Sequence, residues 1–361
     1  MRLFTPSTLC FGTLGVLAAL GGLSGCMTEP AASGPFIGKS VDSIQFASQL
    51  LVYNGQLLVG NRSAVTPGTA VIDTSTGLIS AYYGELLPPS SMAVTSDSEI
   101  VITETNYTQG AVSVLNLSTK ELQKSVITFS SDNFVDTAGG RTYLFDHTTG
   151  AVTGFTGHEP NANIVFNAQT GGSGSDPYDI AVSGGLAFIP RYDQKSLLVL
   201  NPALLNGGTP DSIDLSSYVD TAKADSAFLP RMAWATAYNG FIFVALQRLN
   251  VDYAAQDTSL VVVINAATKQ VTSVIPLHFK NPISAHVVGS SWYLTSVANY
   301  DQTGGVEKID LSQLVTTSTA LIAADTMKAD LYDFVPTGSH SGFVAYSTDY
   351  GVMTQVKKVS F

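Results

Sequence analysis

The chain has 361 residues, of which 45% are hydrophobic and only 12% are charged, and its formal net charge is −11. An acidic chain of this kind excludes nucleic acid as a partner, because nucleic-acid-binding proteins present clustered basic side chains. Its two cysteines, Cys10 and Cys26, both lie in the first 26 residues. The rest of the chain must therefore be held together by burial of apolar surface rather than by disulfides.

Residues 1–25 have the pattern of a secretory signal peptide. Arg2 precedes an apolar stretch over residues 9–20, which is too short to span a membrane but has the length of a signal-peptide core. The Leu-Ser-Gly-Cys tetrapeptide at residues 23–26 resembles the lipobox of bacterial lipoproteins. The resemblance implies cleavage before Cys26, lipidation of its thiol and an acylated amino terminus. The alternative is an ordinary signal peptide that happens to contain a cysteine.

Residues 26–40 are rich in Pro, Ala, Ser and Gly, a composition that predicts a flexible tether between the lipid and a folded domain over residues 41–361. The acidic domain is repelled by anionic headgroups, so the acyl chains would supply the membrane attachment. Met27 follows the cysteine in place of Asp, which by resemblance to enteric bacteria favours the outer membrane. The expected location is the bacterial cell envelope, with the leaflet left open.

The stretch from Pro177 to Pro202 shows the unit from which the rest of the chain is built. It holds three short apolar runs, at residues 180–182, 186–189 and 197–200. A Ser-Gly-Gly turn separates the first two runs, and a polar loop separates the last two. Because glycine tolerates positive φ, this pattern predicts a hairpin followed by a third strand.

The same unit recurs along the chain at intervals of 42–52 residues. The marker residues of the first apolar run are Leu50, Met92, Phe134, Ile180, Met232, Ile283 and Phe334. Several third runs end in Asp or Asn, such as Asp73 and Asn265, which are expected to bond their own backbone in turns before a fourth strand. Seven such units predict an all-β fold, a seven-bladed β-propeller of four-stranded antiparallel blades.

The two ends of the repeat array complement one another. The last unit has room for only three strands, whereas residues 41–47 form a lone strand pattern ahead of the first unit. We therefore expect the N-terminal strand to close the last blade, which hides the sheet edges. The third unit is the weakest, because its third run at residues 151–155 is poor in apolar residues. Sandwich domains would need longer spacing, and a membrane barrel longer strands.

The repeat pattern resembles that of YVTN-type surface propellers of bacteria and archaea over residues 45–361. The YVTN tetrad itself is absent, and its nearest equivalents lie at residues 188–191 and 293–296. The segments at residues 190–202 and 243–249 resemble bacterial surface propeller lipoproteins that have no assigned activity. The Gly-His and Trp-Asp signature of WD40 repeats is missing.

In a propeller, the loops after the second strands and the connections between blades share one face, where ligands usually bind. Arginine and tyrosine side chains there would suit a small anionic or planar ligand. The alternative is that each arginine forms an ion pair with an Asp of the neighbouring blade. The candidate ligand-binding residues are Arg62, Glu104, Tyr107, Arg191, Tyr192, Gln247, Arg248, Asn299 and Tyr300 after second strands, and Tyr178 and Arg231 before first strands.

Motifs for catalysis are missing from the sequence. There is no Gly-x-Ser-x-Gly elbow, no HExxH and no calcium loop, so no metal and no cofactor is expected. The sequence predicts a lipid-anchored, monomeric, non-enzymatic propeller that binds a ligand or an envelope protein. One alternative is an accessory subunit of an outer-membrane nutrient transporter. Another is a metal-assisted lyase or hydrolase, for which at least two of His147, Glu104, His286 and Asp349 would have to converge within ~4–6 Å.

Overall fold

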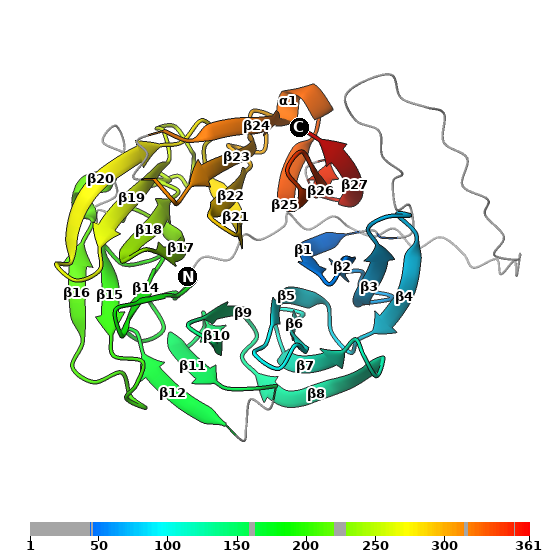
Figure 1. Ribbon diagram of the computed structural model, residues 1–361, viewed down its shortest axis with the longest axis horizontal. Helices are drawn as coiled ribbons and strands as arrows, with labels where there is room; N and C mark the ends of the chain where they lie inside the picture. Colours follow the sequence, from blue (N-terminus) through cyan, green and yellow to red (C-terminus); the bar gives the residue numbers. More distant parts are fainter. Residues whose placement is uncertain (1–43, 45, 159–162, 220–228, 314–316, 350) are drawn as a thin grey trace, which may run out of the picture.

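The computed structural model describes residues 44, 46–158, 163–219, 229–313, 317–349 and 351–361. Its strands form seven antiparallel sheets, arranged as blades around a central axis (Figure 1). This confirms the predicted seven-bladed β-propeller, and the weak third unit forms a complete blade. The predicted signal peptide, the tether and Cys26 lie outside the described residues. No helix among the described residues is long and apolar enough to cross a membrane.

Each blade runs from an innermost first strand to an outermost last strand. The strands are β1 (Ala47–Tyr53), β2 (Gln56–Asn61), β3 (Gly68–Asp73) and β4 (Ile79–Gly84) in blade 1; β5 (Pro89–Val94), β6 (Ile100–Thr105), β7 (Gly110–Asn116) and β8 (Glu121–Phe129) in blade 2; β9 (Asn133–Ala138), β10 (Arg141–Asp146), β11 (Ala151–Phe155) and β12 (Ile164–Gln169) in blade 3; and β13 (Ala181–Ser183), β14 (Leu186–Ile189), β15 (Ser196–Leu200) and β16 (Asp211–Asp214) in blade 4.

The remaining blades follow the same order. They consist of β17 (Met232–Tyr238), β18 (Phe241–Leu246), β19 (Leu260–Asn265) and β20 (Gln270–Pro276) in blade 5; β21 (Pro282–Val288), β22 (Ser291–Ser296), β23 (Gly305–Asp310) and β24 (Thr319–Ala323) in blade 6; and β25 (Asp330–Gly338), β26 (Ser341–Ser347) and β27 (Gln355–Ser360) in blade 7. A 3₁₀ turn η1 (Ser216–Tyr218) and a short helix α1 (Ala324–Met327) lie in connections between blades.

The local sequence accounts for the strands and turns. In the first hairpin Asn54 and Gly55 both have positive φ, as a tight two-residue hairpin turn requires. Asp73 accepts the N–H groups of Ser75 and Thr76 at 2.9 Å, which confirms the expected Asp turn. Second and third strands such as β6 and β7 are buried along almost their whole length, because neighbouring blades cover both of their faces. The outermost strands alternate between exposed and covered residues.

The innermost strands are joined between blades by a contact that the sequence pattern did not predict. A polar side chain just before the buried marker position accepts a backbone N–H from the next blade. The acceptor and donor pairs are Gln49 with Met92, Ser91 with Val135 at 2.7 Å, Asp179 with Ala235 at 2.7 Å, and Asp333 with Leu50 at 2.6 Å. We call these contacts the inner latches. By their N–H groups, Val135 and Ala235 occupy the positions equivalent to Leu50, which the sequence pattern had given to Phe134 and Met232. In blade 5, a register shift between Met232 and Trp234 accounts for the displacement.

The last latch and the N-terminal segment join the two ends of the ring. Ile44 is buried in one cluster with Val335, Phe343 and Val356 of blade 7. The Ala47 N–H donates to the Thr354 carbonyl at 3.3 Å. Blade 7 has three strands among the described residues, and most of the expected fourth strand at residues 41–47 lies outside them. The junction of the chain ends is therefore observed, while the fourth strand stays a prediction.

Candidate functional site

The loops after second strands and the connections between blades lie together on one face, which we call the loop face. The Arg62 N–H donates to the Phe46 carbonyl at 2.9 Å. Equivalent bonds run from Tyr192 to Asp176 at 2.8 Å and from Gln247 to Arg231 at 2.9 Å. Each bond ties the end of a second strand to the residue ahead of the first strand of the same blade. The opposite face carries the hairpins between first and second strands and is called the hairpin face.

Three tyrosines of the loop face have an unusual backbone conformation. Tyr107, Tyr253 and Tyr300 have φ of 65°, 58° and 59°, in the left-handed region that bulky residues rarely adopt. They come from the loops after the second strands of blades 2, 5 and 6, and their exposed fractions are 59%, 49% and 41%. We call these three residues the tyrosine rim. Strain of about 1–2 kcal/mol per residue at exposed positions is typical of functional surfaces.

Next to the rim, side chains of blades 3, 4 and 5 form a stacked column. Its members are Phe134, His147, Tyr178, Tyr192, Arg231 and Tyr253. The ring centroids of His147 and Tyr178 are 4.9 Å apart, and those of Tyr178 and Tyr192 are 5.3 Å apart. The Arg231 guanidinium lies 5.1 Å from the Tyr192 ring and 4.7 Å from the Tyr253 ring. Arg231 also pairs with Asp193, so the column is held by both stacking and charge.

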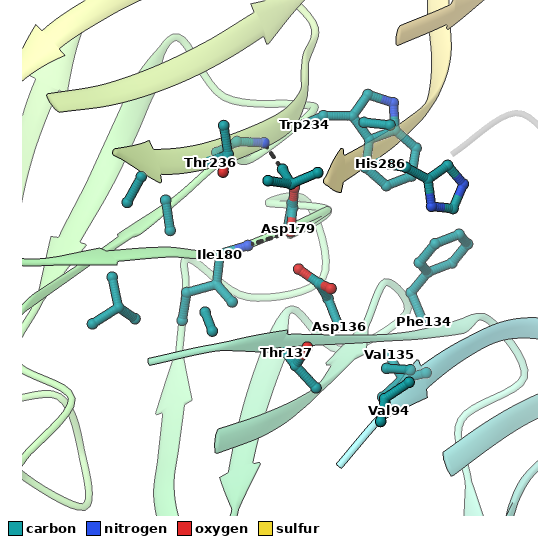
Figure 2. A pocket seen from close by; sticks show the side chains of 18 of the residues that line it. Val94, Phe134, Val135, Asp136, Thr137, Asp179, Ile180, Trp234, Thr236 and His286 are labelled. Atoms are coloured by element: carbon teal, nitrogen blue, oxygen red, sulfur yellow. Dashed lines mark hydrogen bonds between the residues drawn. The ribbon is translucent and has the colours of Figure 1, made fainter. Parts of the chain in front are cut away.

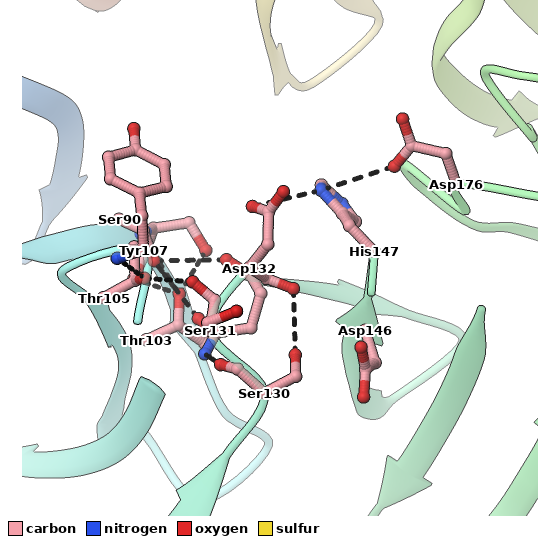
Figure 3. A network of polar contacts seen from close by, with 12 residues as sticks. Ser90, Thr103, Thr105, Tyr107, Ser130, Ser131, Asp132, Asp146, His147 and Asp176 are labelled. Carbon is pink, nitrogen blue, oxygen red and sulfur yellow. Dashed lines mark hydrogen bonds and ion pairs between the residues drawn. The ribbon is translucent and has the colours of Figure 1, made fainter. Parts of the chain in front are cut away.

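His147 lies between two carboxylates in this column (Figure 3). Its Nδ1 atom is 3.5 Å from Oδ1 of Asp132 and 3.5 Å from Oδ1 of Asp176. Burial alone would lower the pKa of His147, but the contact with Asp132 and the charge of Asp176 raise that pKa above its ordinary value. His147 lowers the pKa of Asp132, whereas burial raises the pKa of Asp176 to about 6. The two neighbouring carboxyl groups therefore favour the protonated form of His147.

The structure brings several of the predicted site residues together. Tyr178, Tyr192 and Arg231 are neighbours in the column. Arg62 and Tyr107 form a second group, in which Nη2 of Arg62 donates to the Tyr107 hydroxyl at 2.5 Å and its guanidinium lies 5.3 Å from the ring.

Asn299 and Tyr300 lie on the same face but make separate contacts. Oδ1 of Asn299 accepts the Ala255 N–H at 2.7 Å. The Tyr300 ring lies 6.2 Å from that of Tyr332 in blade 7.

Two of the predicted residues serve the interior instead. Glu104 lies inside β6 rather than in the loop after it, and it is fully buried. Its carboxylate accepts the Leu87 N–H at 2.9 Å and the Ser113 hydroxyl. Gln247 donates from Nε2 to the Pro282 carbonyl at 2.9 Å, which joins blade 5 to blade 6.

Two predicted arginines also bond within the fold. Arg191 donates to the Thr170 carbonyl at 2.6 Å and to the Ser196 carbonyl at 2.9 Å. Arg248 donates to the carbonyls of Tyr218 and Val219 at 2.9 and 2.8 Å, and it pairs with Asp257. Arg62, Arg191 and Arg248 therefore have separate partners. Most of these partners are backbone carbonyls rather than the neighbouring-blade Asp residues considered as an alternative.

The sequence analysis missed a group of titratable residues around the channel. Asp136, His286 and Asp333 lie in the innermost strands of blades 3, 6 and 7, and Asp179 lies just ahead of the innermost strand of blade 4. Nε2 of His286 donates to Asp333 at 2.7 Å. Burial alone would lower the pKa of His286, but Asp333 raises that pKa. Each of these residues interrupts or adjoins an apolar run, and this was the signal that could have revealed them.

One group of side chains could hold a metal ion. Asp97, Glu99 and His158 offer ligand atoms within 4.8 Å of one another, the only such group among the described residues. Nδ1 of His158 is already close to both carboxylates, at 2.6 Å from Asp97 and 2.9 Å from Glu99. The arrangement thus forms an ion pair as it stands.

The four residues on which the enzyme alternative depends do not share contacts. His147 contacts Asp132 and Asp176, His286 contacts Asp333, and Glu104 contacts Leu87 and Ser113. Asp349 accepts the Ser347 hydroxyl at 2.6 Å. Among the contacts of the described residues, none joins two members of the set.

Comparison with known proteins shows what this geometry resembles. No protein-family model matches the sequence, and no curated protein sequence matches it. The structure is similar to a catalytically inactive variant of virginiamycin B lyase from Staphylococcus aureus with quinupristin, with a TM-score of 0.60, 10% identity and coverage of 90% of this chain and 99% of that one.

Two other solved structures are similar to the same extent. For the hydrazine synthase of Kuenenia stuttgartiensis, the TM-score is 0.59 at 12% identity, with coverage of 92% and 99%. For the WD40 domain of Toxoplasma gondii coronin, it is 0.57 at 9% identity, with coverage of 90% and 87%. The chain shares the propeller fold. At these identities the likeness does not extend to activity.

Proposed function

We propose that this chain is a cell-envelope lipoprotein whose propeller binds a ligand or partner protein at the loop face without transforming it. The observation that carries the proposal is the tyrosine rim. Three strained tyrosines from different blades keep exposed fractions of 41% to 59% on this face. Tyrosine supplies a large amphipathic contact area and is enriched at binding hot spots.

The contacts of the loop face favour a planar group over an anion. The rim tyrosines stay partly exposed beside their guanidinium or aromatic neighbours, whereas Arg191, Arg231 and Arg248 already bond to carbonyls or to aspartates. Arg62, stacked on Tyr107, is the exception that a negatively charged edge of a ligand could use. A binding function also agrees with the separation of the candidate acid–base residues, because catalysis needs them together.

Attachment to the membrane through Cys26 is the second part of the proposal, and it rests on the tetrapeptide at residues 23–26. We expect Cys26→Ser to shift the protein from the membrane fraction to the soluble fraction and to abolish incorporation of labelled palmitate. Cys10→Ser, inside the signal peptide, is the matched control and should leave both unchanged. Retention of the Cys26→Ser protein in the membrane would rule out lipid anchoring through this residue.

Binding at the tyrosine rim can be tested with the soluble Cys26→Ser form. The immobilised protein is incubated with envelope extract, and bound molecules are identified by mass spectrometry. We expect Tyr107→Ala, Tyr253→Ala and Tyr300→Ala together to reduce the bound material about tenfold or more. The control combines Leu78→Ala, Leu205→Ala and Val288→Ala, three exposed apolar residues of the hairpin face. Equal losses in both variants, or recovery of a chemically converted ligand, would contradict the proposal.

A further inference from the structure

The central channel holds a cavity that is separate from the tyrosine rim. Its volume is about 420 Å³, within the range of small-molecule sites, and the innermost strands of blades 1 to 6 line it. Phe134 and Trp234 lie toward the stacked column, with ring centroids 5.9 Å apart. Thr137, Gly139 and Val287 line it toward the hairpin face and are exposed there, so the cavity is reached from that face.

Two carboxyl groups project toward one another across this cavity (Figure 2). Asp136 of β9 and Asp179, just ahead of β13, face one another, and burial together with the charge of Asp136 raises the pKa of Asp179, which favours one proton shared by the pair. Asp179 is buried, and its oxygens also accept the N–H groups of Ile180 and Ala235 at 2.7 Å. Asp136 is partly exposed to the cavity, so its carboxyl group is the one a ligand can reach.

The cavity has negative groups without a matching cation. No lysine or arginine is among its lining residues in the described part of the chain. His286, the nearest cationic group, donates to Asp333 at 2.7 Å and is balanced by that carboxylate. The titratable groups that face the acid pair are thus His286 and Asp333. Burial raises the pKa of both Asp136 and Asp179, which is consistent with a pair that keeps a proton because no cation is present.

The aromatic walls indicate what else the ligand carries. Trp234 and Phe134 offer apolar ring surface beside the acid pair, and such surface also attracts cations. Trp234 is only 9% exposed, yet its Nε1 donor has no hydrogen-bond partner among the described residues. The Nε1 atom is itself buried, so the ring of Trp234, rather than this donor, is what a ligand in the cavity can contact. A ligand with a charged group for the acid pair and an apolar body for the aromatic walls fits a cavity that is much larger than an ion.

We propose that the channel cavity binds a small organic amine, whose ammonium group replaces the proton shared by Asp136 and Asp179. The body of the amine packs against Phe134 and Trp234. An ammonium group donates up to three hydrogen bonds, which suits two facing carboxylates. Binding then releases the shared proton to solvent.

The test is calorimetric titration of the soluble Cys26→Ser form with phenoxyethylammonium at pH 7. Phenoxyethanol is the neutral probe of matched shape, and it should bind about tenfold more weakly or worse. Titration in phosphate and in Tris, buffers with different ionisation enthalpies, should report release of about one proton per amine bound. Equal affinity of the alcohol, or amine binding without proton release, would overturn the proposal, as would binding of magnesium chloride in place of the amine.

Variants locate the site. Asp136→Asn should weaken amine binding and abolish proton release, because an amide has no shared proton to lose. Asp325→Asn, an exposed carboxylate on α1, should change neither. Should the Asp136→Asn protein fail to fold, proton release in the unaltered cavity still decides the matter.

Discussion

At the scale of single residues, buried carboxyl groups carry the clearest consequences for stability. Glu85, between β4 and β5, is buried and accepts one hydrogen bond from the Thr69 hydroxyl at 2.7 Å. Burial raises the pKa of Glu85 to about 8. The folded protein thus keeps this proton at neutral pH, whereas the unfolded chain loses it above about 4.5. The contribution of Glu85 to the free energy of unfolding must fall as the pH rises from about 4.5 to 8.

Glu85→Gln should remove this dependence, because the amide is neutral and of the same shape. Relative to the parent protein, we expect the variant to have a free energy of unfolding about 2–3 kcal/mol higher at pH 7.5 and nearly equal at pH 4.5. Urea denaturation at the two pH values measures both. Glu121→Gln on the exposed face of β8 is the control. The same gain at both pH values would show that packing, not ionisation, is responsible.

At the scale of elements, the inner latches are the feature that fixes one blade against the next. Ser91 in β5 is buried, and its hydroxyl oxygen accepts the Val135 N–H of blade 3 at 2.7 Å. Removing the hydroxyl leaves that N–H buried without a partner.

We expect Ser91→Ala to lower the free energy of unfolding by about 1–2 kcal/mol, since an unmade buried hydrogen bond costs about that much. Ser118→Ala, in an exposed Asn turn after β7, loses a hydroxyl that water can replace and should cost less than about 0.5 kcal/mol. Chemical denaturation of the two variants gives the comparison. An equal effect of the two substitutions would mean that the latch contributes nothing specific.

Prediction from the sequence succeeded where the pattern is local. Hairpin turns such as Asn54-Gly55 and the apolar second and third strands follow from glycine geometry and from burial between blades. Contacts across blades were not predicted, because Ser91 and Val135 are 44 residues apart and no periodic pattern marks their pairing. Glu104 illustrates the same limit. It was expected in the loop after the strand, but β6 continues to Thr105, and strand residues differ from loop residues in where their side chains point.

The candidate site was predicted in part for a similar reason. The loop face could be inferred from strand order, and Tyr178, Tyr192 and Arg231 do meet on it. The roles of Arg191 and Arg248 depend on which carbonyls lie within reach, and the sequence does not contain that information. The channel carboxylates were overlooked because the strand pattern does not show which polar residues of the innermost strands face the channel.

At the scale of the whole molecule, closure of the ring gives the protein two distinct faces. Ile44 and the Asp333 latch join blade 7 to blade 1, so the seven blades form one continuous body. The loop face carries the tyrosine rim and the stacked column, and the hairpin face gives access to the channel cavity. The proposal that the molecule is a binding protein depends on the loop face being the one that partners contact.

The most direct measurement is photo-crosslinking in cells that express the protein. A benzoylphenylalanine residue is placed singly at Tyr107, Tyr253 or Tyr300 on the loop face, and at Leu78, Leu205 or Val288 on the hairpin face. All six positions are exposed, so the substitutions should leave the fold intact. The account predicts the same crosslinked species from the three loop-face positions and none from the hairpin face. Crosslinks from the hairpin face alone, or none from any loop-face position, would contradict it.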